Sequence, residues 1–334
     1  ATAALANLRI FASGAVTQTA GSTITSPHLV IDGQAAITLT EANEATNFNA
    51  TTTNGNIQYT DATALDTGLD TAFAANFERG VFATNGGITL IANGELDMNN
   101  TGLATDYSAT NGITFQTSAN NMVRVRNNAT VQATGGTITL QADDLIINDP
   151  IINAGGTVLI RSTGNNEIID LGNGSGAANS TVDGKIKLSA TEIGNITAGT
   201  LSFGHATSGA INVTAALVTT EGMTLTAGNG VNINQDLTTG GATIIDADAN
   251  NDGTGPFTVA NPKALGAGNN AISVTAAKMI LTGTVSSGTA ATTLLTSNGE
   301  AINLGSATDA AGTTLELSDT ELGNVTAGTL SIGD

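Results

Sequence analysis

The densest group of side chains that could do chemistry lies near residue 250. Oxygen-bearing side chains occupy every second position there, at Asp246, Asp248, Asn250 and Asp252. Carboxylate and amide oxygens are the ligands that Ca²⁺ prefers, and alternate spacing with a nearby glycine, here Gly253, resembles the start of a calcium loop. The sixth position would be Asn251 and the twelfth Phe257, where a bidentate Glu is usual. The pattern predicts a Ca²⁺ site, with an ordinary Asp/Asn/Gly turn as the alternative.

A second acidic group, Asp143, Asp144 and Asp149, raises the question of polysaccharide cleavage, which uses paired carboxylates. An acidic sugar would also need cations to bind it and aromatic rings to stack on. The chain has only 9 Lys and Arg residues, two Tyr and no Trp. We therefore expect no enzymatic activity and read these residues as solvated acids on a bend. A polysaccharide-binding or -cleaving protein is the alternative function.

Other reactive or charged residues are isolated in the sequence. His28 and His205 have no neighbouring Ser, Asp or Cys pattern, so surface or turn roles are expected rather than a triad or a zinc site. Arg124 and Arg126 lie on one face of an expected strand. They could hold an anion, although two solvent-facing side chains are the default.

Threonine pairs of the form T-x-T occur in "TIT" at Thr137 and "TLT" at Thr224. Flat threonine ladders are used by ice-binding β-solenoids, which gives a second alternative function. The pairs do not recur in every segment, and the β-propensity of Thr explains its abundance.

Composition excludes several classes of partner. The net charge is −19, with 28 acidic against 9 basic residues, which argues against nucleic acid and anionic membranes. Cysteine is absent, so neither a disulfide framework nor a thiolate metal site is expected. No stretch approaches 18 consecutive apolar residues, so no membrane insertion is expected. The opening "ATAALANLRI" has no initiator Met or signal pattern, which is expected of a mature product or an internal piece.

Short strands recur at regular spacing along the chain. Starts such as "GGITL" at Gly86, "GGTITL" at Gly135 and "GGATII" at Gly240 are spaced like the coils of a solenoid. Residues 136–156 and 222–241 each read as three short strands with a bend after each, and aliphatic residues alternate with Thr or Asn. The pattern predicts an all-β chain that forms a parallel β-helix with coils of about 20–25 residues.

The chain also repeats itself on a larger scale. "LSATEIGNITAGTLSFG" (188–204) and "LSDTELGNVTAGTLSIG" (317–333) agree at thirteen of seventeen positions. Residues 137–204 are restated in 271–333, which indicates duplication of a block of coils within one continuous β-helix over 1–334. Residues 59–82 break the rhythm and are expected to form a loop excursion with a short helix near 71–77, either as a binding loop or as a flap that covers one face.

These repeats resemble a known family. The pattern "GTVLIRSTGNNEIIDLG…KIKLSATEIGNITAGTLSFG…SGAINV" is similar to shaft repeats of large bacterial adhesins of the filamentous haemagglutinin type, as is "SGAVTQTAGSTITSPHLVIDG" near the start. The resemblance implies a right-handed parallel β-helix, two-partner secretion, and an adhesive role at the cell surface or outside the cell. The chain lacks the Asn-Pro-Asn-Gly element of the secretion domain, so it would correspond to a shaft segment.

The expected function is therefore mechanical. Stacked coils would form a stiff rod that carries an adhesive region, or an extracellular fibre such as one in a biofilm matrix. The expected partners are further coils of the same or an identical chain, joined end to end, because uncapped strand edges favour pairing. A host surface or extracellular matrix is a further expected partner.

Overall fold

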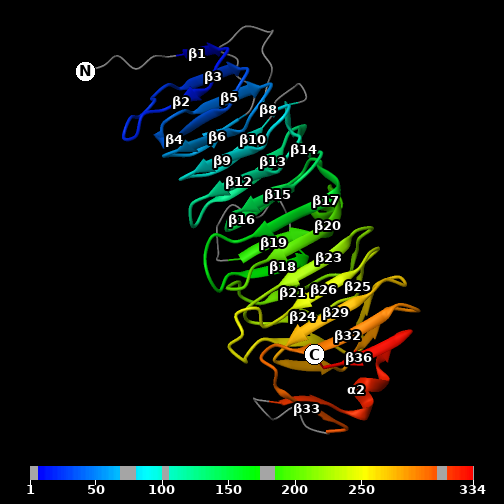
Figure 1. Ribbon diagram of the computed structural model, residues 1–334. Coiled ribbons are helices and arrows are strands. Elements are labelled where there is room, and N and C mark those ends of the chain that lie inside the picture. Colours follow the sequence, from blue (N-terminus) through cyan, green and yellow to red (C-terminus); the bar gives the residue numbers. More distant parts are fainter. Residues whose placement is uncertain (1–6, 68–79, 100–104, 174–184, 307–313, 334) are drawn as a thin grey trace. The chain divides into compact units, whose positions relative to one another are not determined.

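The computed structural model describes residues 7–67, 80–99, 105–173, 185–306 and 314–333. The chain divides into two compact units. Figure 1 labels strands and helices of both units. Unit 1 comprises residues 1–158, 176–183 and 195–198, and unit 2 comprises residues 159–175, 184–194 and 199–334. Almost all of the regular structure is β-strand, so the predicted all-β class is confirmed. A single continuous β-helix over 1–334 stays a prediction.

The strands of unit 1 form three faces, and within each face neighbouring strands run parallel to each other. Face A contains β1 (Asn7–Ala12), β3 (His28–Gly33), β5 (Asn47–Thr52), β8 (Gly80–Ala83), β11 (Thr105–Ala109) and β14 (Ala129–Ala133). Face B contains β2 (Val16–Thr17), β4 (Ile37–Asn43), β6 (Ile57–Asp61), β9 (Ile88–Ala92), β12 (Ile113–Thr117) and β15 (Thr137–Gln141). Face C contains β7 (Leu65–Asp66), β10 (Leu96–Asn99), β13 (Met122–Arg126) and β16 (Asp144–Ile147).

The core of unit 1 consists of equivalent side chains stacked from strand to strand. One row on face B is isoleucine in five successive strands, and each member is buried: Ile37, Ile57, Ile88, Ile113 and Ile138. Neighbouring positions are 20 to 31 residues apart along the chain, so the longest spacing exceeds the predicted coil length of about 20–25 residues. Such stacking explains how small aliphatic residues fill the interior, because each side chain packs on its equivalent about 4.8 Å away.

Unit 2 also has three faces, each made of parallel strands. Face D contains β20 (Ile196–Gly204), β23 (Gly222–Thr226), β26 (Thr243–Asp246), β29 (Ile272–Ala276), β32 (Ala291–Thr296) and β36 (Thr329–Ile332). Face E contains β19 (Lys185–Ser189), β18 (Ile168–Gly172), β21 (Ile211–Val213), β24 (Val231–Ile233), β27 (Pro256–Val259) and β30 (Lys278–Leu281). Face F contains β22 (Leu217–Val218), β25 (Leu237–Thr238), β28 (Ala264–Gly266), β31 (Thr284–Ser286) and β35 (Val325–Thr326).

From β20 to β32 the chain visits faces D, E and F in strict rotation. This rotation, with parallel pairing to the strand three places later, is compatible with a β-solenoid.

The predicted alternation of inward and outward side chains is confirmed: Val231 and Ile233 are buried while Asn232 between them is half-buried. Outward asparagines also stack, since Asn232 Nδ2 donates to Asn212 Oδ1 at 2.9 Å. A separate pair, β33 (Ala301–Leu304) and β34 (Thr314–Leu317), precedes β35.

Two of the predicted details differ from the structure. The third strand of the 136–156 coil does not stop in a turn: β17 runs over Ile151–Arg161. Gly155 takes a φ of +83°, and the buried Asn153 amide donates to the carbonyls of Gly136 (3.1 Å) and Thr157 (2.8 Å), so the bend is absorbed within the strand. The ends of the predicted 59–82 excursion are also strand, in β6, β7 and β8. Its centre, including the helix expected near 71–77, lies outside the described residues.

Both copies of the repeated sequence contain a single helical turn that was not predicted. The turns are α1 (Ala190–Gly194) and α2 (Asp319–Gly323). Neither is long and apolar enough to cross a membrane, and the same holds for every helix in the part of the chain that the structure describes.

Candidate functional site

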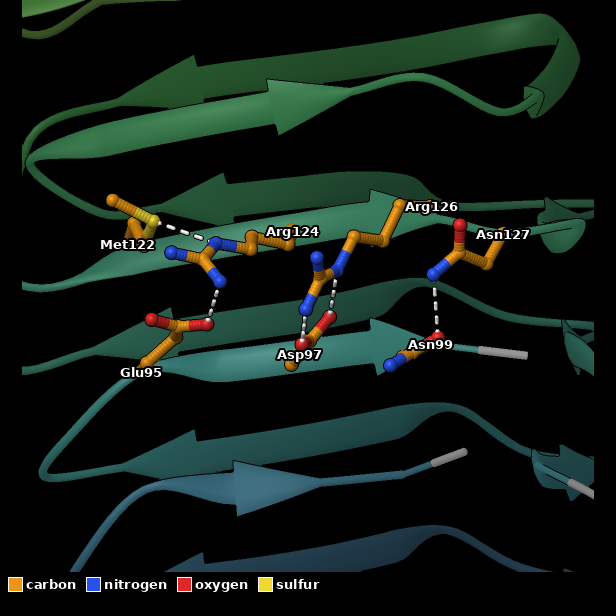
Figure 2. A network of polar contacts seen from close by, with 7 residues as sticks. All are labelled: Glu95, Asp97, Asn99, Met122, Arg124, Arg126 and Asn127. Carbon is orange, nitrogen blue, oxygen red and sulfur yellow. Dashed lines mark hydrogen bonds and ion pairs between the residues drawn. The ribbon is translucent and has the colours of Figure 1, made fainter. Parts of the chain in front are cut away.

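A polar network on the outer surface joins β10 and β13 on face C (Figure 2). Arg126 donates to both carboxylate oxygens of Asp97, with its Nε 2.9 Å from Oδ1. Arg124 lies beside it, and its Nη1 is 2.6 Å from Glu95 Oε1. Asn127 Nδ2 donates to Asn99 Oδ1 at 2.7 Å and extends the series. Arg124, Arg126 and Asn127 therefore each contact a partner about one coil earlier.

The two arginines lie on the outward face of β13, as expected, but their side chains are only partly exposed and each is paired with a carboxylate. Asp97 pairs in register with Arg124, but the ion pairs run diagonally, to residues two positions back. Long side chains can make such diagonal contacts across neighbouring strands. Each guanidinium is compensated by a carboxylate of the preceding coil. The pair thus links two coils, and it offers no uncompensated positive charge to an anion.

Burial and neighbouring charges act in opposite directions on Glu95. Burial raises its pKa, and this effect exceeds the lowering by Arg124. The hydrogen bonds from Arg126 to Asp97 raise the pKa of the Arg126 guanidinium, so that residue stays charged. Half-exposed ion pairs of this kind contribute on the order of 0–1 kcal/mol each. The network is suited to holding register between coils rather than to proton transfer.

The acids proposed for polysaccharide chemistry are caps for backbone groups. Asp143 and Asp144 are 1% and 2% exposed, so their interpretation as solvated residues is wrong. Asp143 Oδ2 accepts from the Asn120 backbone N–H at 2.6 Å, and Asp144 Oδ1 accepts from Leu145 N–H at 2.8 Å. Asp149 Oδ2 accepts from Asn128 N–H at 3.0 Å. These contacts give each carboxylate a structural role at a bend.

The structure brings three members of the predicted calcium loop together. Asp248 is buried and accepts from Gly253 N–H (3.1 Å) and Ser297 Oγ (2.5 Å). Asn250 Nδ2 donates to the exposed Asp252 Oδ2 at 2.8 Å. Hydrogen bonds, chiefly from the Thr254 hydroxyl, lower the pKa of Asp252.

The fourth member, Asp246, precedes these residues at the end of β26. One of its carboxylate oxygens is buried with no hydrogen-bond partner among the described residues, and burial raises its pKa. Within the described ranges, no group of three or more His, Cys, Asp or Glu side chains could hold a metal ion. Calcium binding by Asp246, Asp248, Asn250 and Asp252 stays a prediction.

The remaining candidates take part in local contacts. His205 follows β20, and its Nε2 lies 3.2 Å from Ser162 Oγ. Burial, together with Arg161, lowers the pKa of His205. His28 lies in β3.

Outward threonines align in one row on β9, β12 and β15 (Thr89, Thr114 and Thr139), but the next outward row has Ile91, Gln116 and Gln141. The uninterrupted threonine row on this face is three residues long, because Gln58 of β6 separates it from Thr38 of β4.

The sequence interpretation missed the polar contacts made by the repeated segment. In the second copy, Glu321 Oε2 accepts from Ser318 N–H and Oγ at 2.9 Å each, and Glu321 N–H donates to Ser318 Oγ, which is a capping box. The first copy has the same contacts between Ser189 and Glu192. The signal was present in the sequence, because Ser-x-x-Glu is the pattern of a helix N-terminus.

The same turn also takes the place of a strand partner. Glu321 Oε1 accepts from the Leu281 N–H at 3.0 Å, and Asn324 Nδ2 donates to the Leu281 carbonyl at 2.8 Å. Two side chains thus satisfy both backbone groups of one strand residue, as a neighbouring strand would. In the first copy, Asn195 Nδ2 likewise donates to the carbonyl of a strand residue, Ile147, at 2.9 Å.

A buried polar cluster in unit 1 was also missed. Asp61 is fully buried, and its carboxylate accepts from Tyr59 Oη, Ala45 N–H, Thr63 N–H and Thr63 Oγ1, each at 2.8 Å. Burial raises the pKa of Tyr59, whose ring stacks on Phe48 with centroids 4.0 Å apart. Four donors leave this carboxylate satisfied, so the cluster is structural.

Comparisons with protein-family models, with curated proteins and with solved structures found no match to this chain.

Proposed function

We propose that this chain is a structural segment of a secreted bacterial repeat protein, in which right-handed β-helical coils form a stiff extracellular rod or fibre. The single observation that carries the proposal is the strict rotation of strands through faces D, E and F, with equivalent aliphatic residues stacked in each. In a solenoid each coil contacts mainly its neighbours, so length can grow without a new core.

A right-handed coil is supported by general stereochemistry. Connections between parallel strands of one sheet are right-handed in almost all proteins, because of the twist of the strands. The resemblance to shaft repeats of filamentous haemagglutinin-type adhesins supports the same hand. It also supports secretion by a two-partner system and a location outside the cell or at its surface.

End-to-end contact between coils is the interaction that the proposal requires. Among the described strands, β1 pairs only with β3 and β36 only with β32. Leu330 on β36 is 36% exposed. Open strand edges with apolar side chains favour pairing with further coils, whether these belong to the same chain or to an identical one.

The proposal is tested by light scattering after size exclusion, combined with negative-stain electron microscopy of the purified chain. We expect association that increases with concentration and particles that lengthen at constant width. A strictly monomeric protein at all concentrations would contradict the assembly role. Incubation with polygalacturonate is the second arm, and specific release of sugar would replace the structural role with an enzymatic one.

A further inference from the structure

Two outward-facing phenylalanines lie in one row on face A of unit 1. The registers align Phe11 with Asp32, Asp32 with Thr51, and Thr51 with Phe82. Each strand step is about 4.8 Å, so the two rings are on the order of 14 Å apart along the face. Each phenylalanine borders a surface hollow, and both hollows lie where the face A strands end.

The first hollow has a volume of about 320 Å³ and is lined by Phe11, Ala12, Ser13, Asp32, Gly33 and Gln34. Its aromatic ring is held in place. The Arg9 guanidinium lies 4.2 Å from the ring centroid, and Arg9 is fixed by ion-pair contacts of 2.6 and 3.0 Å to Asp32 Oδ2. Thr51 Oγ1 in turn donates to Asp32 Oδ1 at 3.1 Å. Because Phe11 is 71% exposed, this supported ring is presented to solvent.

The second hollow has a volume of about 220 Å³ and surrounds the half-buried Phe82 with small and hydroxyl-bearing residues: Ala83, Thr84, Ser108, Ala109, Thr110 and Thr134. Ala83 and Ala109 are in register and form its floor. Drug-sized ligands occupy pockets of roughly 300 Å³ or more. The size and the ring of hydroxyl groups suit a smaller polar unit that also has one apolar face.

We propose that this face of unit 1 binds a neutral oligosaccharide, with one sugar on Phe11 and another on Phe82. A pyranose ring presents C–H groups on one face, which pack on an aromatic ring, and hydroxyl groups around its edge. Gln34 and Ser13 can hydrogen-bond the edge at the first position, and Thr84, Ser108 and Thr134 at the second. A chain of a few sugars spans the distance between the two rings.

Charge selects the neutral class of sugar. Among the described residues, Asp32 is the only charged one that lines either hollow, and Arg9 compensates it. In the part of the chain that the structure describes, neither hollow is lined by a cation that could hold a carboxylate or sulfate group, and the net charge of −19 repels an acidic polymer. The site stands on these contacts alone, so it does not depend on the structural role proposed above.

Isothermal titration calorimetry of the full chain tests the site, with cellohexaose and chitohexaose as neutral probes and hexagalacturonate as the acidic probe. We expect at least one neutral probe to bind more tightly than the acidic probe. Phe11→Ala and Phe82→Ala should each weaken that binding by about tenfold, and the double variant should abolish it. Phe11→Tyr should bind within about twofold of the wild type, because the ring is retained.

Val218→Ala is the matched control, since Val218 is an exposed apolar residue of unit 2, at 76%. Circular dichroism of each variant checks that the fold is intact. The proposal is overturned if no neutral probe binds, if the phenylalanine variants behave like Val218→Ala, or if hexagalacturonate binds as well as the neutral probes. Light scattering on the same samples reports assembly separately, so failure of the glycan site and failure of the structural role give different results.

Discussion

The two copies of the repeated segment fold alike locally but differ in burial. In both, a Ser–Glu capping box starts one helical turn, and an Asn side chain then donates to the carbonyl of a strand residue. The strand that follows differs. Leu201 and Phe203 of the first copy are buried, whereas the equivalent Leu330 and Ile332 are 36% exposed and half-buried. The local sequence thus determines the turn, while neighbouring strands determine the burial.

The largest expected difference is in the leucine pair. Leu201→Ala should lower the free energy of unfolding by about 3 kcal/mol, because a fully packed side chain leaves a cavity. Leu330→Ala should cost less than about 1 kcal/mol, since that side chain is already partly in water. Guanidinium chloride unfolding followed by circular dichroism measures both. Equal losses would show that burial does not distinguish the copies.

The capping glutamates should come next. Glu321→Ala removes an acceptor from Ser318 N–H and from Leu281 N–H, which should cost about 2 kcal/mol. Glu192→Ala should cost a similar amount, because Glu192 is 3% exposed and makes the same cap. Gln at either position retains an acceptor oxygen and should lose less. Hydrogen exchange of the Leu281 backbone N–H measures the contact in the second copy directly. If that N–H is as protected in Glu321→Ala as in the wild type, Glu321 does not act as its hydrogen-bond partner.

Removing the asparagine contact should have a smaller effect of about 1 kcal/mol in each copy. Asn195→Ala removes the side-chain N–H that donates to the Ile147 carbonyl, and Asn324→Ala removes the one that donates to the Leu281 carbonyl. Asp at these positions has no N–H to donate, so it should be no better than Ala. Chemical unfolding of the four variants checks this order. If the Asp variants are as stable as the wild type, the N–H donation is not the stabilising contact.

A pH effect should be confined to the first copy, which is followed directly by His205. Ser162 Oγ donates to the Gly164 carbonyl, so its contact with Nε2 requires a proton on that nitrogen. Thr207 N–H donates to Nδ1, which must then be unprotonated. Because the folded pKa is lowered, stability from neutral His205 is complete above about pH 6.5 and falls as the pH drops towards the folded value.

Unfolding midpoints measured from pH 7.5 to 4.5 should therefore decline less in His205→Gln than in the wild type over that window. Identical pH profiles would assign the decline to other groups.

The smallest expected effect concerns the loop between the two copies. If the 246–253 loop binds Ca²⁺, calorimetry should give a signal for the wild type that is lost in Asp252→Asn. Asp252 is the suitable site for substitution because it is exposed, whereas Asp248→Ala would remove a buried acceptor of three hydrogen bonds. Flat traces for both proteins would leave the loop as an Asp/Asn/Gly turn.

The sequence predicted the strands better than it predicted the polar contacts. Alternation and the recurring Gly positions predict inward Ile138 and outward Thr139, because the strand period is two and the coil repeats. The partners of Arg124 and Asp143 could not be predicted, since they lie about one coil away and the coil length varies. The helical turns could have been found from Ser-x-x-Glu, but the β-like context of "LSATE" and "LSDTE" concealed them.

The stacked isoleucines of unit 1 have a consequence for the evolution of the gene. Where Ile57, Ile88 and Ile113 occupy one column, removal of a coil would bring the flanking isoleucines onto each other with the same fit. Unequal recombination within such a gene could shorten or lengthen its product by whole coils without a misfit in the interior. Alleles that differ in the number of coils are therefore expected to fold equally well.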